Sequence, residues 1–227
     1  MVVPTLNEEE ALPGLLGDLR ALGATIDEVV IADAGSSDAT AAVARAHGAI
    51  VVTAHRGRAL QLNAAAAVAQ GDWLLFLHAD SRLDAEARDV LRRTLNTEPG
   101  PAAAVFQFRI DLPRGWKQFI EWGQRLREAL FGLAYGDQGL LVRRDCFAAV
   151  GGFLNVPLME DVTMIRRLEQ HVGVARLPAA VLTSGRRYLA NGVLRTWLTH
   201  TVLIGLFALG VSPVRLAALR EGMSPRG

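Results

Sequence analysis

Carboxylates follow long apolar runs at two places in this 227-residue sequence, and a third acidic pair lies far downstream. Asp33 comes after Val29-Val30-Ile31, and Asp80 comes after Trp73-Leu74-Leu75-Phe76-Leu77. The third site is Glu160-Asp161. Buried parallel strands have such apolar runs, and their carboxyl ends line the crevice where open α/β sheets bind ligands. Three acidic groups in one crevice need positive partners.

Strands and helices alternate along the first hundred residues, and this alternation must bring the carboxylates together. We predict strands over 28–32, 49–53 and 72–77. We predict one helix over 7–22, a second that ends near residue 47, a third that ends near residue 71 and a fourth over 84–96. Asn7 followed by Glu10 has the spacing of a capping box at a helix start. The short connections indicate a parallel, right-handed, Rossmann-like sheet, and hence the α/β class.

The second half is less regular. We predict strands over 103–110 and 139–143, an amphipathic helix over 116–130 and a helix before Gly151-Gly152. A further helix should cover 160–171, and two short strands should follow near Val174 and Val181.

Composition limits the partners and the compartment. The chain is 51% apolar with a net charge of +1, so we expect a globular domain and no nucleic-acid partner. A single cysteine, Cys146, excludes an intramolecular disulfide and fits a reducing cytoplasm. The start has no basic segment of a signal peptide. Only Met1-Val2-Val3 precede Pro4, so either the first strand is short or the natural start lies upstream.

The last forty residues differ from the rest. The segment 193–211 is mostly apolar and close to the minimum length that spans a bilayer, but it contains Arg195, Gly205 and Gly210. Two alternatives remain for it: a helix on the cytoplasmic face of an anionic membrane, or a helix that packs on the sheet or in a homodimer. Ser212-Pro213 predicts the start of another short helix. We divide the chain into a domain over 1–190 and a helical appendage over 191–227.

Several residues have the chemistry to bind phosphate. In Pro4-Thr5-Leu6-Asn7-Glu8, at a strand end that leads into a helix, the backbone N–H groups that follow Pro4 can bind a nucleotide. Arg56-Gly57-Arg58 precedes a helix and is either a diphosphate clamp or a pair of solvated loop arginines. Arg186-Arg187-Tyr188 is either a second clamp or a surface pair.

The downstream carboxylates suggest a metal ligand and a base. In His78-Ala79-Asp80, Asp80 can hold Mg²⁺ or Mn²⁺ between two phosphates, and we expect His78 to be a structural hydrogen-bonding residue. Asp161 at a helix start is a candidate general base for an alcohol. We interpret Glu160 as a first-turn acidic residue that opposes the helix dipole.

Taken together, these residues resemble the family 2 glycosyltransferases of GT-A fold over nearly the whole chain. The residues that carry the resemblance are Val3-Pro4-Thr5-Leu6-Asn7-Glu8, Asp33 with Ser36 and Asp38, His78-Ala79-Asp80, Glu160-Asp161 and Arg186-Arg187-Tyr188. The His-Ala-Asp form and Tyr135-Gly136-Asp137-Gln138-Gly139 resemble a small bacterial subgroup associated with arsenosugar biosynthesis.

The resemblance implies roles for individual residues. A nucleotide diphosphate sugar would be bound by Pro4, Thr5, Asn7, Glu8, Asp33, Ser36, Arg58, His78, Asp80 and Arg187. Asp80 would carry Mg²⁺ or Mn²⁺ together with the donor diphosphate, and Asp161 would be the base of an inverting displacement at the sugar C1. Asp137, Gln138 and Glu160 would lie on the side of the acceptor hydroxyl. Arg187 matches the arginine of the family motif Gln-x-x-Arg-Trp, with Tyr188 for the Trp, and the incomplete motif suggests transfer of a single sugar.

Three other functions compete with this one. A polyprenyl-phosphate glycosyltransferase would use the apolar C-terminal segment. A nucleotidyltransferase on a similar sheet usually has a glycine-rich loop with a basic residue after the first strand, which Pro4-Thr5-Leu6-Asn7-Glu8 lacks. A sugar-nucleotide-binding protein without activity would agree with His78 but not with an intact Asp161.

Overall fold

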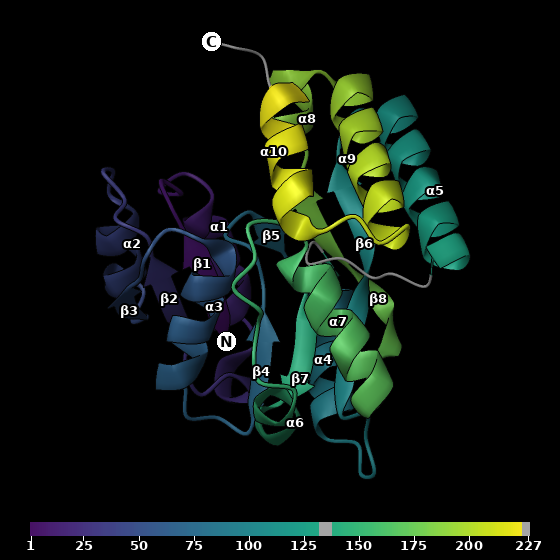
Figure 1. Cartoon of the computed structure of the whole chain (residues 1–227). Coiled ribbons are helices and arrows are strands. Elements are labelled where there is room, and N and C mark those ends of the chain that lie inside the picture. The colour runs from purple at the N-terminus through teal and green to yellow at the C-terminus, as the bar shows by residue number, and fades with distance from the viewer. Residues whose placement is uncertain (132–137, 224–227) are drawn as a thin grey trace.

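The computed structural model describes residues 1–131 and 138–223, which form one mixed sheet covered by helices (Figure 1). The order of the strands is β3-β2-β1-β4-β7-β6-β8-β5. Their bounds are β1 Val2–Thr5, β2 Val30–Asp33, β3 Ile50–Thr53, β4 Trp73–Phe76, β5 Ser81–Arg82, β6 Ala103–Asp111, β7 Leu140–Arg143 and β8 Ala175–Ser184. β1 is parallel to β2 and β4, and β6 is parallel to β8, whereas β7 runs antiparallel between β4 and β6. The predicted α/β class with a mostly parallel sheet is confirmed.

The helices cover both faces of this sheet. Their bounds are α1 Leu12–Arg20, α2 Thr40–Ala46, α3 Arg58–Val68, α4 Ala85–Leu95, α5 Arg114–Phe131, α6 Arg144–Ala149, α7 Glu160–His171, α8 Arg186–Asn191, α9 Val193–Ala208 and α10 Pro213–Met223. A short 3₁₀ turn, Gly23–Thr25, follows α1. The predicted helix over 84–96 and the helix start at Pro213 are confirmed.

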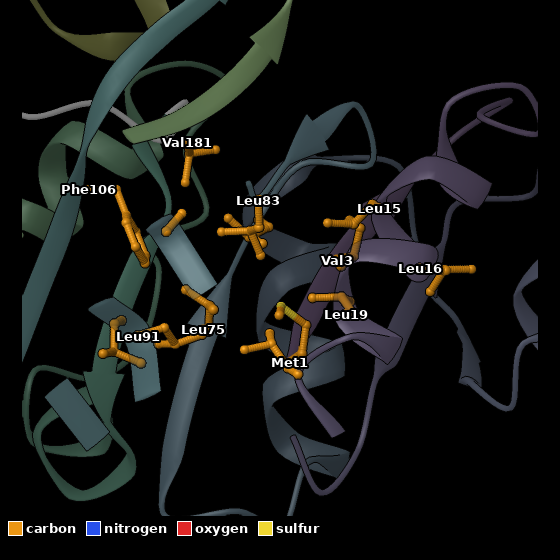
Figure 2. Packing of buried hydrophobic residues seen from close by; sticks show 14 of the residues in the cluster. Met1, Val3, Leu15, Leu16, Leu19, Leu75, Leu83, Leu91, Phe106 and Val181 are labelled. Atoms are coloured by element: carbon orange, nitrogen blue, oxygen red, sulfur yellow. The ribbon is translucent and has the colours of Figure 1, made fainter. Parts of the chain in front are cut away.

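Neighbouring residues of one strand enter two different cores, because side chains alternate across a sheet. Val3, Ile31 and Leu75 pack with leucines of α1 and α4, and Figure 2 shows this cluster around Val3, Leu15, Leu75 and Leu91. Their chain neighbours in β1, β2 and β4 pack on the other face with α3, α6 and α7. The sheet is therefore buried on both faces, and its strand ends are free to carry functional groups.

The first predicted helix begins later than the sequence suggested, and its predicted capping box is wrong. Asn7 has a left-handed backbone, with φ of 54°, and its side chain accepts a hydrogen bond from the Ser37 N–H at 2.9 Å. The helix itself begins at Leu12, after a turn from Glu8 to Ala11. Asn7 thus joins the first loop to the loop after β2 instead of capping a helix.

The two short strands predicted near Val174 and Val181 are one ten-residue strand, β8. The register of β6 against β8 shifts between Val105 and Gln107, opposite the stretch of β8 that contains Pro178. Proline cannot donate to a sheet ladder and is tolerated at such an irregularity. The sequence suggested a break where the strand contains a bulge. β5 and α8 were not predicted at all.

Three helices stand side by side beyond the end of the sheet: α10, α9 and α5 (Figure 1). Phe119 of α5 packs against Trp197 of α9, with ring centroids 4.7 Å apart. Leu203 and Ile204 of α9 pack with Met159 and Val162 at the start of α7. Among the described residues, none of the helices combines the length and apolar character needed to cross a bilayer. The boundary near residue 190 stays a prediction.

The contact between α5 and α9 depends on a glycine. A Cβ atom added to Gly123 would lie 2.8 Å from Nε1 of Trp197, whereas one added to Gly115 of the same helix meets nothing within 4 Å. We therefore expect Gly123→Ala to lower the free energy of unfolding. Overpacking costs about 1–3 kcal/mol, which exceeds the roughly 1 kcal/mol that alanine gains over glycine in a helix. Urea denaturation measures the change.

Gly115→Ala is the matched control, and it should leave the stability unchanged or raise it. Equal stability of the two variants would show that α9 does not pack as closely on α5 as described.

Candidate functional site

Two loops at the carboxyl ends of β1 and β2 are joined by the carboxylate of Asp33. It accepts hydrogen bonds from the N–H groups of Gly35 and Ser36, at 3.1 and 2.9 Å, and from the hydroxyls of Ser36 and Thr5. Ser36 Oγ in turn accepts from the Asn7 N–H at 2.9 Å. A carboxylate has about four acceptor positions, so these donors use its capacity. Asp33 therefore fixes the shape of the first loop.

Gln61 of α3 also holds the ends of β1 and β2 in place, and it was not predicted from the sequence. Its side-chain amide donates to the carbonyl oxygens of Thr5 and Ala32, at 2.9 and 3.0 Å. Gln61 is buried and ties α3 to the ends of β1 and β2. A single polar residue on the buried face of an alanine-rich helix was the signal that could have revealed it.

A cavity of about 200 Å³ opens beside these loops at the carboxyl ends of β1 and β4. Seven predicted donor-binding or clamp residues line it, and so do Leu6, Gln61 and Ala79. The seven are Pro4, Thr5, Glu8, Arg58, His78, Asp80 and Arg187. The structure thus brings most of the predicted donor site together, whereas Asn7, Asp33 and Ser36 lie behind it and shape its loops.

His78 lies between two arginines in this cavity. Burial, and after it the positive charges of Arg58 and Arg187, lower the pKa of the imidazole well below its usual value. The ring is therefore neutral at neutral pH, and it offers a neutral polar group to the cavity.

The low pKa of His78 makes stability depend on pH. The unfolded imidazole takes up a proton near pH 6.5 and the folded one does not, so the free energy of unfolding should fall as pH drops below about 6.5. The uptake of one proton on unfolding lowers the free energy of unfolding by at most about 1.4 kcal/mol per pH unit. We expect His78→Asn to reduce this fall, as measured by urea denaturation at several pH values. The exposed His47→Asn is the control and should keep the slope of the parent protein.

Arg58 also forms an ion pair with Glu160. Its Nη1 lies 3.2 Å from Oε1 of Glu160, and Glu160 is only 5% exposed. Burial, together with the neighbouring charge of Asp161, raises the pKa of the Glu160 carboxyl, and Arg58 opposes this rise. Glu160 does begin α7, as the helix-dipole interpretation required, but its main partner is the clamp arginine.

Arg186 connects Glu8 and Asp80. Its guanidinium forms an ion pair with the Glu8 carboxylate, and its Nε lies 3.9 Å from Oδ2 of Asp80. The N–H of Glu8 donates to Thr40 Oγ1 at 2.8 Å. Arg186 and Arg187 begin α8, so this short helix brings two positive charges to the end of β4. Of the two, Arg187 lines the cavity and Arg186 neutralises the carboxylates.

The residues around Asp80 fit a divalent cation that is shared with a diphosphate. Within the described residues, no group of three or more His, Cys, Asp or Glu side chains could form a metal cage of its own. Asp80 supplies one carboxylate beside a cavity lined by Arg58 and Arg187. Mg²⁺ is commonly held by one or two carboxylates plus substrate phosphates, and this arrangement suits it.

A second cavity, of about 350 Å³, lies on the other side of Arg58. Asp161 and Glu160 line it, and α8, α9 and α10 contribute Tyr188, His200, Leu203, Ile204 and Arg220. The loop 156–159, Phe108 and the buried Gln124 also line it, together with Gly57 and Val162. Asp161 also lines a narrow cleft with Arg58 and His78, between the two cavities. The C-terminal helices thus cover a cavity that no sequence pattern had indicated.

Of the other predicted acceptor-side residues, only Gln138 belongs to the described part of the chain. Gln138 is described and buried, and it does not line the larger cavity. Asp137 lies outside the described residues.

Comparison with known proteins was made by sequence and by structure. The model of the family named glycosyl transferase family 2 matches residues 1–142. A TPR repeat-containing protein of Synechococcus elongatus is 35% identical over 105 residues, which are 44% of this chain. The chain spans only 25% of the length of that relative.

Two solved structures share the fold. One is TarS 1–349 of S. aureus in complex with UDP-GlcNAc, with a TM-score of 0.60 and 16% identity over 81% of this chain and 57% of that one. The other is glucosyl-3-phosphoglycerate synthase from Mycobacterium tuberculosis in complex with Mn²⁺, uridine diphosphate and glucosyl-3-phosphoglycerate. Its TM-score is 0.58, with 18% identity over 81% of this chain and 68% of that one. The predicted GT-A fold is confirmed.

Proposed function

Since the chain belongs to glycosyl transferase family 2 and is an enzyme of the glycosyltransferase type, we propose that it moves one sugar from a nucleotide diphosphate sugar to an acceptor hydroxyl, with inversion at C1. The observation that carries the proposal is the position of Asp161. Its side chain lines the larger cavity and the cleft that leads to Arg58 and His78, so it adjoins both substrates.

In the proposed reaction, the Asp161 carboxylate accepts the proton of the acceptor hydroxyl. The hydroxyl oxygen forms a bond to the sugar C1 from the face opposite the diphosphate. The bond between C1 and the phosphate oxygen breaks, and its electron pair leaves with the nucleoside diphosphate. The configuration at C1 is thereby inverted, and the reaction is favoured by holding the two substrates in adjoining cavities.

The leaving diphosphate gains negative charge, and the positive side chains around it would stabilise that charge. Arg58 and Arg187 line the donor cavity, and the planar guanidinium suits a phosphate. A divalent cation bound at Asp80 with the diphosphate would neutralise part of the developing charge. The Mn²⁺ and uridine diphosphate named with the synthase from M. tuberculosis support this cofactor. Neutral His78 adds no positive charge of its own.

The acceptor is proposed to occupy the larger cavity. Its volume of about 350 Å³ is at the small end of ligand pockets, and polar and apolar side chains contribute to its lining in nearly equal measure. It therefore suits a small amphipathic alcohol and transfer of one sugar. Most of its lining lies after residue 142, outside the part that the family model matches. The chain resembles a subgroup associated with arsenosugar biosynthesis, and we propose that its acceptor is of the kind that this subgroup uses.

Family membership sets aside the nucleotidyltransferase alternative. The polyprenyl-phosphate glycosyltransferase stays as a second candidate, favoured by the exposed leucines of α9. We propose that the reaction takes place in the cytoplasm. Homodimer formation stays a prediction.

A donor screen tests the proposal. Each of a set of uridine, guanosine and thymidine diphosphate sugars is offered with Mn²⁺ or Mg²⁺, and release of the nucleoside diphosphate is followed with and without small alcohols. One donor should support release that an acceptor accelerates, and the product should have the inverted anomeric configuration by NMR. A product with retained configuration would exclude the mechanism, and acceleration only by a polyprenyl phosphate would favour the second candidate.

A further inference from the structure

Helix α9 has two apolar faces with different surroundings. On one face, Val193, Leu203 and Ile204 are buried against the rest of the protein. On the opposite face, Leu194, Leu198 and Val202 are 57%, 53% and 40% exposed. These three are four residues apart, so they form a single row along the helix. We call them the α9 row. A row of exposed apolar side chains on a packed helix indicates a binding surface.

The helices beside α9 expose further large apolar side chains. Trp122 and Leu126 of α5 are 59% and 42% exposed, and α5 lies next to α9 (Figure 1). Leu209, just after α9, is 84% exposed. Tryptophan with leucine is the combination that amphipathic helices bury at the boundary between lipid headgroups and acyl chains.

The charges around this surface are mostly positive. Helices α9 and α10 contain Arg195, Arg215 and Arg220 and one acidic residue, Glu221, and of these arginines only Arg220 lines the larger cavity. Arg195 is exposed and follows the first leucine of the α9 row. Clusters of basic residues on an amphipathic helix are attracted to anionic lipids.

We propose that the α9 row binds the surface of a bilayer that contains anionic phospholipids, with α9 lying in the interface. A second copy of the chain fits this surface less well. In a two-fold dimer the same surface meets itself, so the arginines of one copy would face those of the other, and like charges across an interface are unfavourable.

The proposal gives α9 two connected roles. Its inner face contributes His200, Leu203 and Ile204 to the larger cavity, and its outer face carries the α9 row. Binding to a bilayer would therefore set that cavity close to the lipid surface. Lipid binding itself depends only on the exposed face, so it can be tested whether or not the proposed transfer reaction occurs.

Vesicle flotation tests the proposal with the full chain. One set of vesicles contains phosphatidylcholine alone, and the other contains phosphatidylcholine mixed with phosphatidylglycerol. The parent protein should float with the mixed vesicles at low salt and much less with phosphatidylcholine alone. The double variant Leu194→Gln/Leu198→Gln should reduce flotation by about tenfold or more, since it removes two apolar anchors. Arg195→Gln should weaken binding mainly at low salt.

Leu154→Gln is the control, because Leu154 is similarly exposed but lies in the loop before α7. It should float like the parent. Circular dichroism melting curves show that the variants are folded. Failure of the parent to float, or flotation of the double variant at the parent level, would overturn the proposal. A dimer in light scattering that the double variant abolishes, without any flotation, would assign the row to a second copy.

Discussion

Replacing Asp161 by Asn should lower turnover by roughly two to four orders of magnitude, which is the usual contribution of a general base. The amide keeps the size of the side chain but does not accept the acceptor proton. The donor affinity should stay nearly unchanged, because Asp161 lines the larger cavity and the cleft but not the donor cavity. Steady-state kinetics with the donor found in the screen give the turnover, and calorimetry with that donor gives the affinity.

A matched variant separates this effect from general damage. Asp89 is an exposed aspartate of α4 that pairs with Arg92 of the same helix, so Asp89→Asn makes the same chemical change away from the site. It should have the activity of the parent enzyme. If Asp161→Asn retains turnover within about tenfold of the parent, Asp161 has no part in proton transfer.

Removing the divalent cation should have the second largest effect. We expect a chelator to lower turnover by roughly 100-fold or more, because a cation contributes several kcal/mol of charge stabilisation and each 1.4 kcal/mol is tenfold. Added Mn²⁺ should restore the activity. Asp80→Asn should need far more Mn²⁺ for the same rate, since it removes the carboxylate expected to bind the cation.

The cation should bind only together with the nucleotide. Calorimetry should detect Mn²⁺ binding when the nucleoside diphosphate is present and little binding without it, because one carboxylate is too few for a metal cage. Tight Mn²⁺ binding to the protein alone would contradict the shared site and would make His78 a metal ligand. Asp84→Asn, at the N-cap of α4, is a control that leaves the cation requirement unchanged.

The parallel half of the sheet followed from the sequence because its signals are local. Apolar runs ending in Asp33 and Asp80 predicted strands, and parallel connections bring their ends to one edge. Pro4, Thr5, His78 and Asp80 therefore met in one cavity as expected. The left-handed Asn7 was missed because its geometry depends on a hydrogen bond to Ser37, thirty residues away.

The larger cavity was not predictable in the same way. Gln124, His200 and Arg220 come from three different helices and meet only when α5, α9 and α10 pack together. None of them has a spacing that suggests a site. The ion pair of Arg58 with Glu160 likewise spans 102 positions, and nothing in either local sequence indicates the partner.

The ion pair of Arg58 with Glu160 has a consequence for the order of events in the catalytic cycle. Arg58 lines the donor cavity and at the same time stabilises the charge of a carboxylate that has almost no contact with water. A diphosphate that draws Arg58 toward itself leaves Glu160 beside Asp161 without its cation, and the protonated form of Glu160 is then favoured. Donor binding and protonation of Glu160 would thus be linked, and each would strengthen the other to the same extent. Loading of the donor is expected to favour proton uptake at Glu160, and departure of the nucleoside diphosphate is expected to favour return of that proton to water.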